Sequence, residues 1–270
     1  MRRHPFFAIC LTLIIAHPAL SQPAAAPAQP AQPSPASTEP AKAPTKAPAA
    51  PTPPAATPTP RPDKWWQDKH AAILANMKKG GHQTVFLGDS ITEGWGGEGK
   101  KIWAEQLADV HPVNCGIGGD QTQHVLARLD DGLLDALAAK NNDIGTVVLL
   151  IGTNNVSNPK EQPENIAAGV HAIVQRLRTK LPNAQIVLMA IFPRGENPNA
   201  QRETITKANT LIKAQSTGDK IAFVDIGPKF LNAQGAIPKD LMPDFLHLSE
   251  AGYRIWADGI KARLAKPAPK

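Results

Sequence analysis

Short apolar runs alternate with segments of helical periodicity from residue 83 almost to the carboxyl end of the chain. Runs of this kind, bounded by Gly, Asn or Pro, are typical of strands buried on both faces of a sheet. Strands are expected at 85–88, 110–115, 146–151, 186–192 and 221–226. Because helical segments separate them, the pattern predicts a three-layer α/β/α, flavodoxin-like sandwich with a five-stranded parallel sheet of order 2-1-3-4-5.

Apolar residues at helical spacing predict the helices that connect these strands. Helices are expected at 63–79, 101–110, 123–139, 162–181 and 201–215, and a last one after Ser249, whose side chain is a suitable N-cap. No internal repeat and no second domain boundary interrupts this pattern. Residues 63–270 are therefore expected to form one domain.

The amino-terminal part of the chain has a different composition. Arg2 and Arg3 precede an apolar run, and Ala19-Leu20-Ser21 supplies small residues for cleavage. This order predicts a secretory signal peptide over residues 1–21, or a membrane anchor if the signal is not cleaved. Residues 22–62 hold 14 prolines among 41 residues and no large apolar side chain, which predicts a disordered linker able to tether the domain to the cell envelope. The expected location is secreted or periplasmic.

Charge and cysteine content narrow the function classes. From Asp63 onward the chain has 24 basic and 22 acidic residues, a net charge of +2 that does not favour nucleic-acid binding. Once a signal peptide is removed, Cys115 is the single cysteine, so no intrachain disulfide is expected. No HExxH or comparable ligand spacing occurs, and neither a metal nor another cofactor is expected.

Polar residues follow the predicted strands where each strand ends. Ser90 follows the first strand, and Gly119, Asn154 and Arg194 follow the next three. Asp244 and His247 come after the fifth strand, three residues apart. Because the carboxyl ends of parallel strands meet at one edge of a sheet, we expect these residues to converge on one site.

Each of these features also has a simpler interpretation. Asp89 and Ser90 can cap a helix, and Asn154 can form a turn. The glycines at 116–119 can serve a tight turn with positive φ, or offer backbone N–H groups to an anion. The Asp-x-x-His pair alone can be a metal pair or a surface turn.

Together the residues supply what acyl transfer needs. Ser90 would attack a carbonyl carbon, His247 would accept its proton, and Asp244 would fix the imidazole tautomer. The oxyanion would be held by the backbone N–H groups of Ser90 and Gly119 and by the side-chain amide of Asn154. Activity is expected to fall as the imidazole becomes protonated, at about pH 6–7 for an ordinary histidine.

Taken in order, these blocks resemble the SGNH (GDSL-type) hydrolases. The resemblance rests on Gly-Asp-Ser-Ile from Gly88, the turn at Gly119, Gly-Thr-Asn-Asn from Gly152 and Asp244-x-x-His247, and it covers about residues 83–264. Within that superfamily the chain looks most like the catalytic α subunits of intracellular platelet-activating-factor acetylhydrolases, through Gly-Ile-Gly-Gly-Asp at 116–120 and Phe-Pro-Arg-Gly at 192–195.

The resemblance implies Ser90 as nucleophile, Asp244 and His247 as the other triad members, and Gly119 and Asn154 as oxyanion donors. It also implies a small acyl pocket and substrate contacts from four further residues, Ile91, Thr153, Arg194 and Leu246. Two departures stand out. Thr92 occupies the second glycine position of GxSxG, so a strained nucleophile elbow is not implied. A signal peptide differs from the intracellular location of those subunits, so their phospholipid substrate is not carried over.

The expected function is that of an exported serine esterase cleaving acetyl or other short-chain esters, with a carbohydrate acetylesterase as the specific expectation. The substrate would be a small acyl ester or an acylated polysaccharide, and the resemblance also allows a homodimer. A lysophospholipase or lipid esterase is the enzymatic alternative. A catalytically silent binding module on the same fold is the alternative from a different class, although such a module needs none of these residues.

Overall fold

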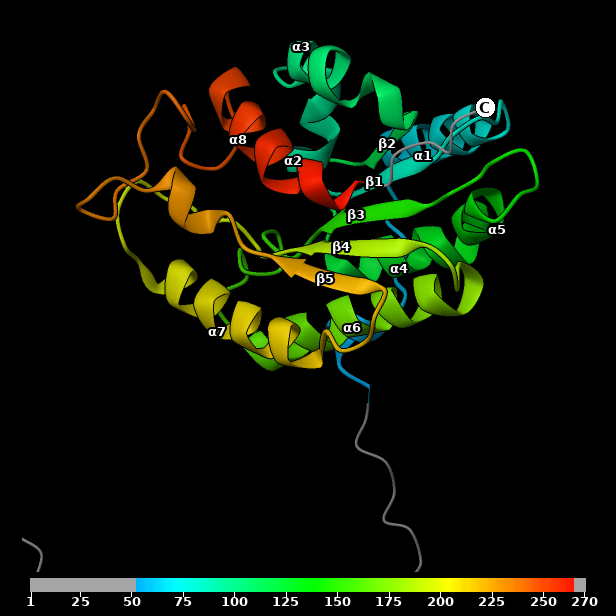
Figure 1. Cartoon of the computed structure of the whole chain (residues 1–270). Coiled ribbons are helices and arrows are strands. Elements are labelled where there is room, and N and C mark those ends of the chain that lie inside the picture. Colours follow the sequence, from blue (N-terminus) through cyan, green and yellow to red (C-terminus); the bar gives the residue numbers. More distant parts are fainter. Residues whose placement is uncertain (1–51, 265–270) are drawn as a thin grey trace, which may run out of the picture. The chain divides into compact units, whose positions relative to one another are not determined.

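A five-stranded parallel sheet of order β2-β1-β3-β4-β5 organises the computed structural model, which describes residues 52–264 (Figure 1). Its strands are β1 (Thr84–Gly88), β2 (Pro112–Gly116), β3 (Thr146–Leu150), β4 (Gln185–Met189) and β5 (Ile221–Val224). Gly88 lies opposite Gly116 on one side and Leu150 on the other. The predicted fold and strand order are confirmed, while β4 and β5 end earlier than expected.

Alternate strand residues point to opposite faces of the sheet and build two apolar layers. Val85 and Leu87 pack into one layer, and Phe86 between them packs into the other. The Val85 layer is covered by α1 (Lys64–Met77), α4 (Thr122–Arg128), α5 (Leu134–Leu137), α6 (Pro163–Lys180) and α7 (Ala200–Gln215). The Phe86 layer is covered by α2 (Ser90–Glu93), α3 (Lys100–Ile102) and α8 (Glu250–Ile260), which lie above the sheet in Figure 1.

Two of the expected helices are irregular. The helix expected at 123–139 is kinked at Asp131 and Gly132, where glycine has a φ of 87° and breaks the α-helical geometry. The segment expected at 101–110 is helical but changes pitch along its length. The structure also contains short 3₁₀-helices at Pro54–Ala56, Gly94–Gly96, Ala108–Val110, Gly227–Phe230 and Lys261–Arg263. Short π-helices lie at Trp103–Leu107 and Leu129–Leu133.

The proline-rich segment before α1 lies on the domain, which corrects the boundary expected at residue 63. Ala55 is buried, its carbonyl accepts a hydrogen bond of 2.7 Å from Thr122 Oγ1, and Thr59 N donates to the Gln123 carbonyl. Gly169 of α6 permits this approach, since a Cβ there would lie 2.4 Å from the Ala55 oxygen. A chain rich in proline can still pack through its carbonyl groups, although proline has no backbone N–H to donate.

The remaining amino-terminal expectations, the signal peptide at 1–21 and the linker up to residue 51, lie outside the described residues. Within 52–264, none of the helices combines the length and the apolar character of a membrane span.

Candidate active site

Ser90 lies at the carboxyl end of β1, where the chain turns into α2. The Asp89 side chain caps this short helix by accepting a hydrogen bond of 3.0 Å from Ile91 N. Gly88 allows the sharp turn because a Cβ there would lie 2.2 Å from the Leu150 carbonyl oxygen. Ser90 is not among the described residues with positive φ, in agreement with the expectation that a strained elbow is not needed.

The side chains of Ser90, His247 and Asp244 form one chain of hydrogen bonds. Ser90 Oγ lies 2.9 Å from His247 Nε2, and His247 Nδ1 lies 2.6 Å from Asp244 Oδ2. The second carboxylate oxygen of Asp244 accepts from the backbone N–H groups of His247, at 2.7 Å, and of Leu246, at 3.1 Å. The structure therefore brings together three residues that the sequence separates by up to 157 positions.

The turn that carries Asp244 and His247 is tightly constrained. Phe245 between them has a φ of 60°, which is uncommon for a bulky residue, and its carbonyl accepts from Gly195 N. Ser249 caps α8 directly after the turn, as expected, by accepting from Gly252 N. The position of the imidazole is thus fixed from both sides.

Electrostatics keep Asp244 ionised. Its partial burial alone would raise the pKa, but the hydrogen bonds from the His247 side chain and from two backbone N–H groups outweigh burial and hold the pKa of Asp244 below its ordinary value. A carboxylate that stays charged orients the imidazole, so that Nδ1 carries the proton and Nε2 is free to accept one from Ser90.

The three expected oxyanion donors lie on neighbouring strand ends. Ser90 N is the first amide of α2 and has no acceptor within that helix. Gly119 is exposed in a turn with φ of 75°. Asn154 Nδ2 donates one hydrogen bond, of 2.9 Å, to the Asp120 carbonyl. Because an amide NH₂ has two protons, the second N–H of Asn154 remains available.

A buried ion pair below this loop was not expected from the sequence. Asp120 Oδ2 lies 2.8 Å from Arg128 Nη2, and neither side chain is exposed. Trp66 Nε1 donates to Asp120 Oδ1 at 2.7 Å. Burial raises the pKa of Asp120, while Arg128 and Trp66 favour its ionised form. The one feature of the sequence that indicates this ion pair is Arg128 itself, a charged residue on the apolar face of α4.

Asp89 is a second buried carboxyl group and directly precedes Ser90. The pKa of Asp89 is raised to about 7, because burial and the nearby charge of Asp120 outweigh the hydrogen bond from Ile91 N and the charge of Arg194. Its Oδ2 has no hydrogen-bond partner among the described residues. Asp89 is therefore a structural cap whose protonation state changes near neutral pH.

The four residues expected to contact the substrate differ in environment. Ile91 is buried in the Phe86 layer, and its carbonyl accepts from Tyr253 Oη at 2.7 Å. Arg194 Nη1 donates to Thr153 O at 2.7 Å, so this guanidinium supports the loop that carries Asn154. Leu246 is half-buried. The hydrogen bond from Arg194 to Thr153 was not expected from the sequence, which predicted only a substrate contact for Arg194.

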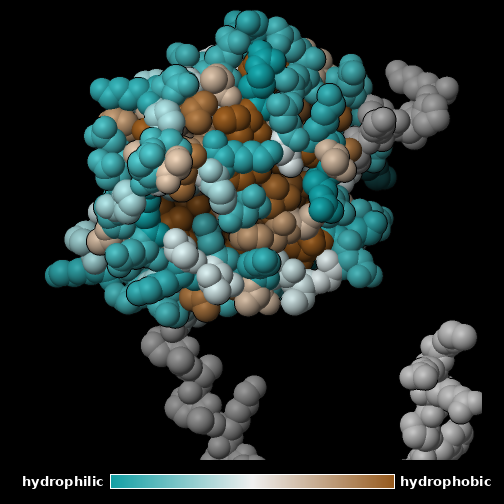
Figure 2. Space-filling view, turned by 60° about the vertical axis from the view of Figure 1, so that its left-hand side comes forward, coloured by the Kyte–Doolittle hydropathy of each residue, from teal (hydrophilic) through white to brown (hydrophobic). Residues whose placement is uncertain are grey.

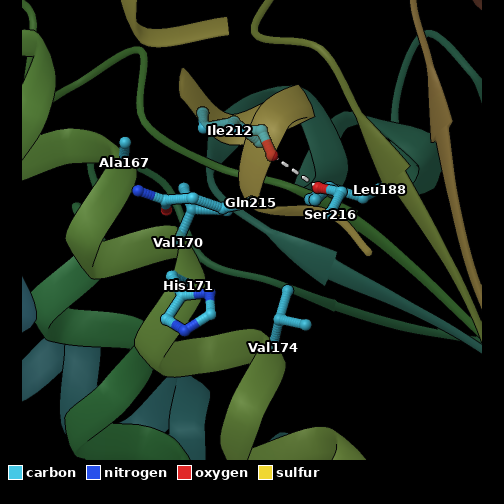
Figure 3. A pocket seen from close by; sticks show the side chains of 8 residues that line it. All are labelled: Ala167, Val170, His171, Val174, Leu188, Ile212, Gln215 and Ser216. Atoms are coloured by element: carbon cyan, nitrogen blue, oxygen red, sulfur yellow. Dashed lines mark hydrogen bonds between the residues drawn. The ribbon is translucent and has the colours of Figure 1, made fainter. Parts of the chain in front are cut away.

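Two hollows in the described part of the chain are lined by residues other than Ser90, Asp244 and His247. Figure 2 shows hydrophobic residues exposed among polar ones on the side to which the strands point in Figure 1. One hollow of about 190 Å³ is lined by Ile191, Ile205 and Leu231, among others. Another, small one lies between α6 and α7, where Ser216 Oγ donates to the Ile212 carbonyl (Figure 3). Its lining includes His171 of α6, which is exposed.

No group of three His, Cys, Asp or Glu side chains that could hold a metal ion occurs in the described part of the chain.

Comparison with known proteins shows which family has this order of residues. The model of the GDSL-like lipase/acylhydrolase family matches residues 86–255. Over 189 residues the chain is 38% identical to platelet-activating factor acetylhydrolase IB subunit alpha1 of Bos taurus, covering 70% of this chain and 77% of that protein.

Solved structures that share the fold include two hydrolases from bacteria. A GDSL-like lipase from Bacteroides thetaiotaomicron superimposes with a TM-score of 0.58 at 21% identity, covering 74% of this chain and 96% of that one. The acetylxylan esterase of Geobacillus stearothermophilus superimposes with a TM-score of 0.54 at 20% identity, covering 69% and 95%.

Proposed function

This chain belongs to the GDSL-like lipase/acylhydrolase family, whose members hydrolyse ester bonds, and from that premise we propose that it is a serine esterase for short acyl groups, with acetyl as the preferred group. The observation that carries the proposal is the continuous hydrogen-bond chain from Ser90 Oγ through His247 to Asp244. No other arrangement of the described residues links a hydroxyl, an imidazole and a carboxylate in this order.

The proposed reaction has two steps. Ser90 Oγ attacks the ester carbonyl carbon while His247 Nε2 takes the hydroxyl proton. The oxygen of the tetrahedral intermediate is held by the N–H groups of Ser90, Gly119 and Asn154, each worth a few kcal/mol at the transition state. His247 then gives its proton to the departing alcohol oxygen, which leaves an acyl group on Ser90.

The second step returns the enzyme to its starting state. A water molecule attacks the acyl carbon, His247 takes one of its protons, and the collapse of the second intermediate releases a carboxylic acid. The proton on His247 returns to Ser90 Oγ. Asp244 holds the Nδ1–H throughout and stabilises the imidazolium that forms twice in the cycle.

The proposed substrate is an acetylated carbohydrate met outside the cytoplasm. The name of the curated relative as an acetylhydrolase supports an acetyl group, and the signal peptide expected at 1–21 supports export to the periplasm or the medium. A lipid esterase is the second candidate, because the same relative is named for platelet-activating factor, a lipid.

Hydrolysis of nitrophenyl esters from acetyl to long acyl by the purified full chain tests this proposal. We expect the highest kcat/KM for acetyl and its loss in Ser90→Ala. Ser216→Ala is a matched control, since among the described residues the Ser216 hydroxyl, directly after α7, bonds only to the Ile212 carbonyl of that helix. Equal rates for wild type and Ser90→Ala would reject a serine esterase, and a rate that rises with acyl length would favour the lipid esterase.

A further inference from the structure

We propose that Arg61, from the proline-rich segment before α1, is a positioning residue that fixes the Gly118–Gly119 peptide so that the Gly119 N–H is available to the oxyanion. The inference deepens the proposed function and rests on it. Arg61 lies outside residues 86–255, the part of the chain that the family model matches.

The contact that carries this role is a single hydrogen bond to the peptide in question. Arg61 Nη1 donates to the Gly118 carbonyl oxygen at 3.1 Å. A trans peptide is planar, so its C=O and N–H point in opposite directions. Holding the Gly118 oxygen towards Arg61 therefore turns the Gly119 N–H away from Arg61. No described residue accepts a hydrogen bond from that N–H.

The Gly118–Gly119 peptide needs a hydrogen bond from outside to fix its orientation, because both residues that it joins are glycines. Without a Cβ at Gly118 or Gly119, rotation of the peptide meets little steric resistance, and Gly119 already has φ of 75°. The neighbouring peptide is held elsewhere, since Gly118 N donates to Glu93 Oε2 at 2.7 Å. On the other side Asp120 is fixed by Arg128 and Trp66. Among the described residues, Arg61 alone binds the polar atoms of the peptide between them.

Arg61 is itself held in place. Its Nε donates to Asp63 Oδ2 at 3.2 Å, and its guanidinium carbon lies 4.7 Å from the centre of the Trp65 ring. The guanidinium is planar and offers donors in a fixed fork, which allows it to bind a carboxylate and a carbonyl at once. The Arg61 side chain is 20% exposed. Its guanidinium is thus pre-organised before substrate arrives.

The orientation of this N–H affects the transition state more than the bound substrate, because the oxygen gains its negative charge only when Ser90 attacks. Loss of Arg61 should therefore lower kcat and leave KM nearly unchanged. Loss of one oxyanion donor typically costs about 10²–10³ in kcat, so a donor that is turned away for part of the time should cost about tenfold or more.

The test measures kcat and KM for nitrophenyl acetate with the full chain and with Arg61→Ala. We expect kcat to fall about tenfold or more and KM to change less than about twofold, with a melting curve close to that of the wild type. Arg61→Lys keeps a charged donor without the fork, and its kcat is expected between the two. Arg178→Ala is the matched control, because Arg178 also donates to backbone carbonyls, those of Ala184 and Pro182.

A kcat for Arg61→Ala equal to that of Arg178→Ala would overturn the positioning role. A second outcome would also overturn it. If Arg61→Lys has a kcat as low as that of Arg61→Ala and both variants melt at a lower temperature, the loss of activity follows from loss of folding. Ser90→Ala separates this outcome from failure of the proposed function. If Ser90→Ala is inactive and Arg61→Ala is not impaired, only the role of Arg61 is wrong; if Ser90→Ala keeps full activity, the serine-esterase mechanism is wrong.

Discussion

The Asp120 carboxylate and the Arg128 guanidinium form an ion pair of 2.8 Å in which neither side chain is exposed to solvent. Arg128 also donates to the carbonyls of Gly88 and Cys115, at the ends of β1 and β2. The pair therefore ties the strand that leads to Ser90 to the loop that carries Gly119. Removing two charges from water is costly, and the cost is offset only when both partners are present.

Breaking this pair should strongly destabilise the fold. Asp120→Asn keeps an acceptor for Trp66 but leaves the Arg128 charge buried without a counter-charge, and we expect the free energy of unfolding to fall by about 3–5 kcal/mol. Urea denaturation measures it. Asp68→Asn removes the carboxylate of the exposed Lys64–Asp68 pair and should cost less than about 1 kcal/mol. Similar losses in the two variants would show that burial does not govern the Asp120 pair.

Asp244→Asn should nearly abolish esterase activity without unfolding the protein. An amide at this position can donate to Nδ1, which stabilises the imidazole tautomer that cannot accept the Ser90 proton, and kcat should fall by about 10³–10⁴. Steady-state rates with nitrophenyl acetate measure the change. Asp240→Asn, four residues earlier and exposed, should keep the wild-type rate. A kcat within about tenfold of wild type for Asp244→Asn would contradict the role given to this carboxylate.

The Asp89 carboxyl should make stability fall as pH rises. Its pKa is about 7 in the folded chain against an ordinary value of 3.8, so between these values the folded chain binds a proton that the unfolded chain has lost. The free energy of unfolding then decreases by up to about 1.4 kcal/mol per pH unit in this window.

Asp89→Asn removes this proton and keeps an acceptor for Ile91 N. Urea denaturation of both proteins at pH 5 and pH 8 is the measurement, because groups that do not interact with Asp89 titrate alike in the two and cancel in the difference. We expect the stability of the variant relative to wild type to increase from pH 5 to pH 8. A difference that is the same at both values would mean that Asp89 is ionised in the folded chain throughout.

Gly169→Ala should destabilise the protein although alanine is the better helix former. In an ordinary helix interior the exchange gains up to about 1 kcal/mol. Here the new Cβ would lie 2.4 Å from the Ala55 oxygen and 2.5 Å from Thr122 Oγ1, so the proline-rich segment must move, at a cost of about 1–3 kcal/mol. Thermal denaturation tests this, with Gly96→Ala as control because no atom lies within 4 Å of a Cβ there. A higher melting temperature for Gly169→Ala would argue against close packing of this segment.

The strands and the order of the site residues could be predicted because both follow from local pattern. The apolar run at 146–151 needs no partner to be recognised as a strand, and a parallel sheet places Ser90, Asn154 and His247 on one edge whatever the loop details are. The packing of residues 52–62 was missed because composition alone predicts disorder for a proline-rich chain. It does not show that the Ala55 carbonyl meets Thr122, 67 positions later.

The sequence alone determined the α/β order of this chain and the residues that converge at the strand ends, since hydrophobic periodicity and strand polarity act over short distances along the chain. Only the tertiary structure decided how these residues are held. Trp66 and Arg128 meet the Asp120 carboxylate, and Arg61 meets the Gly118 carbonyl 57 positions away. Such contacts form because buried polar groups of distant segments must find hydrogen-bond partners, and a local sequence pattern does not predict which segments meet.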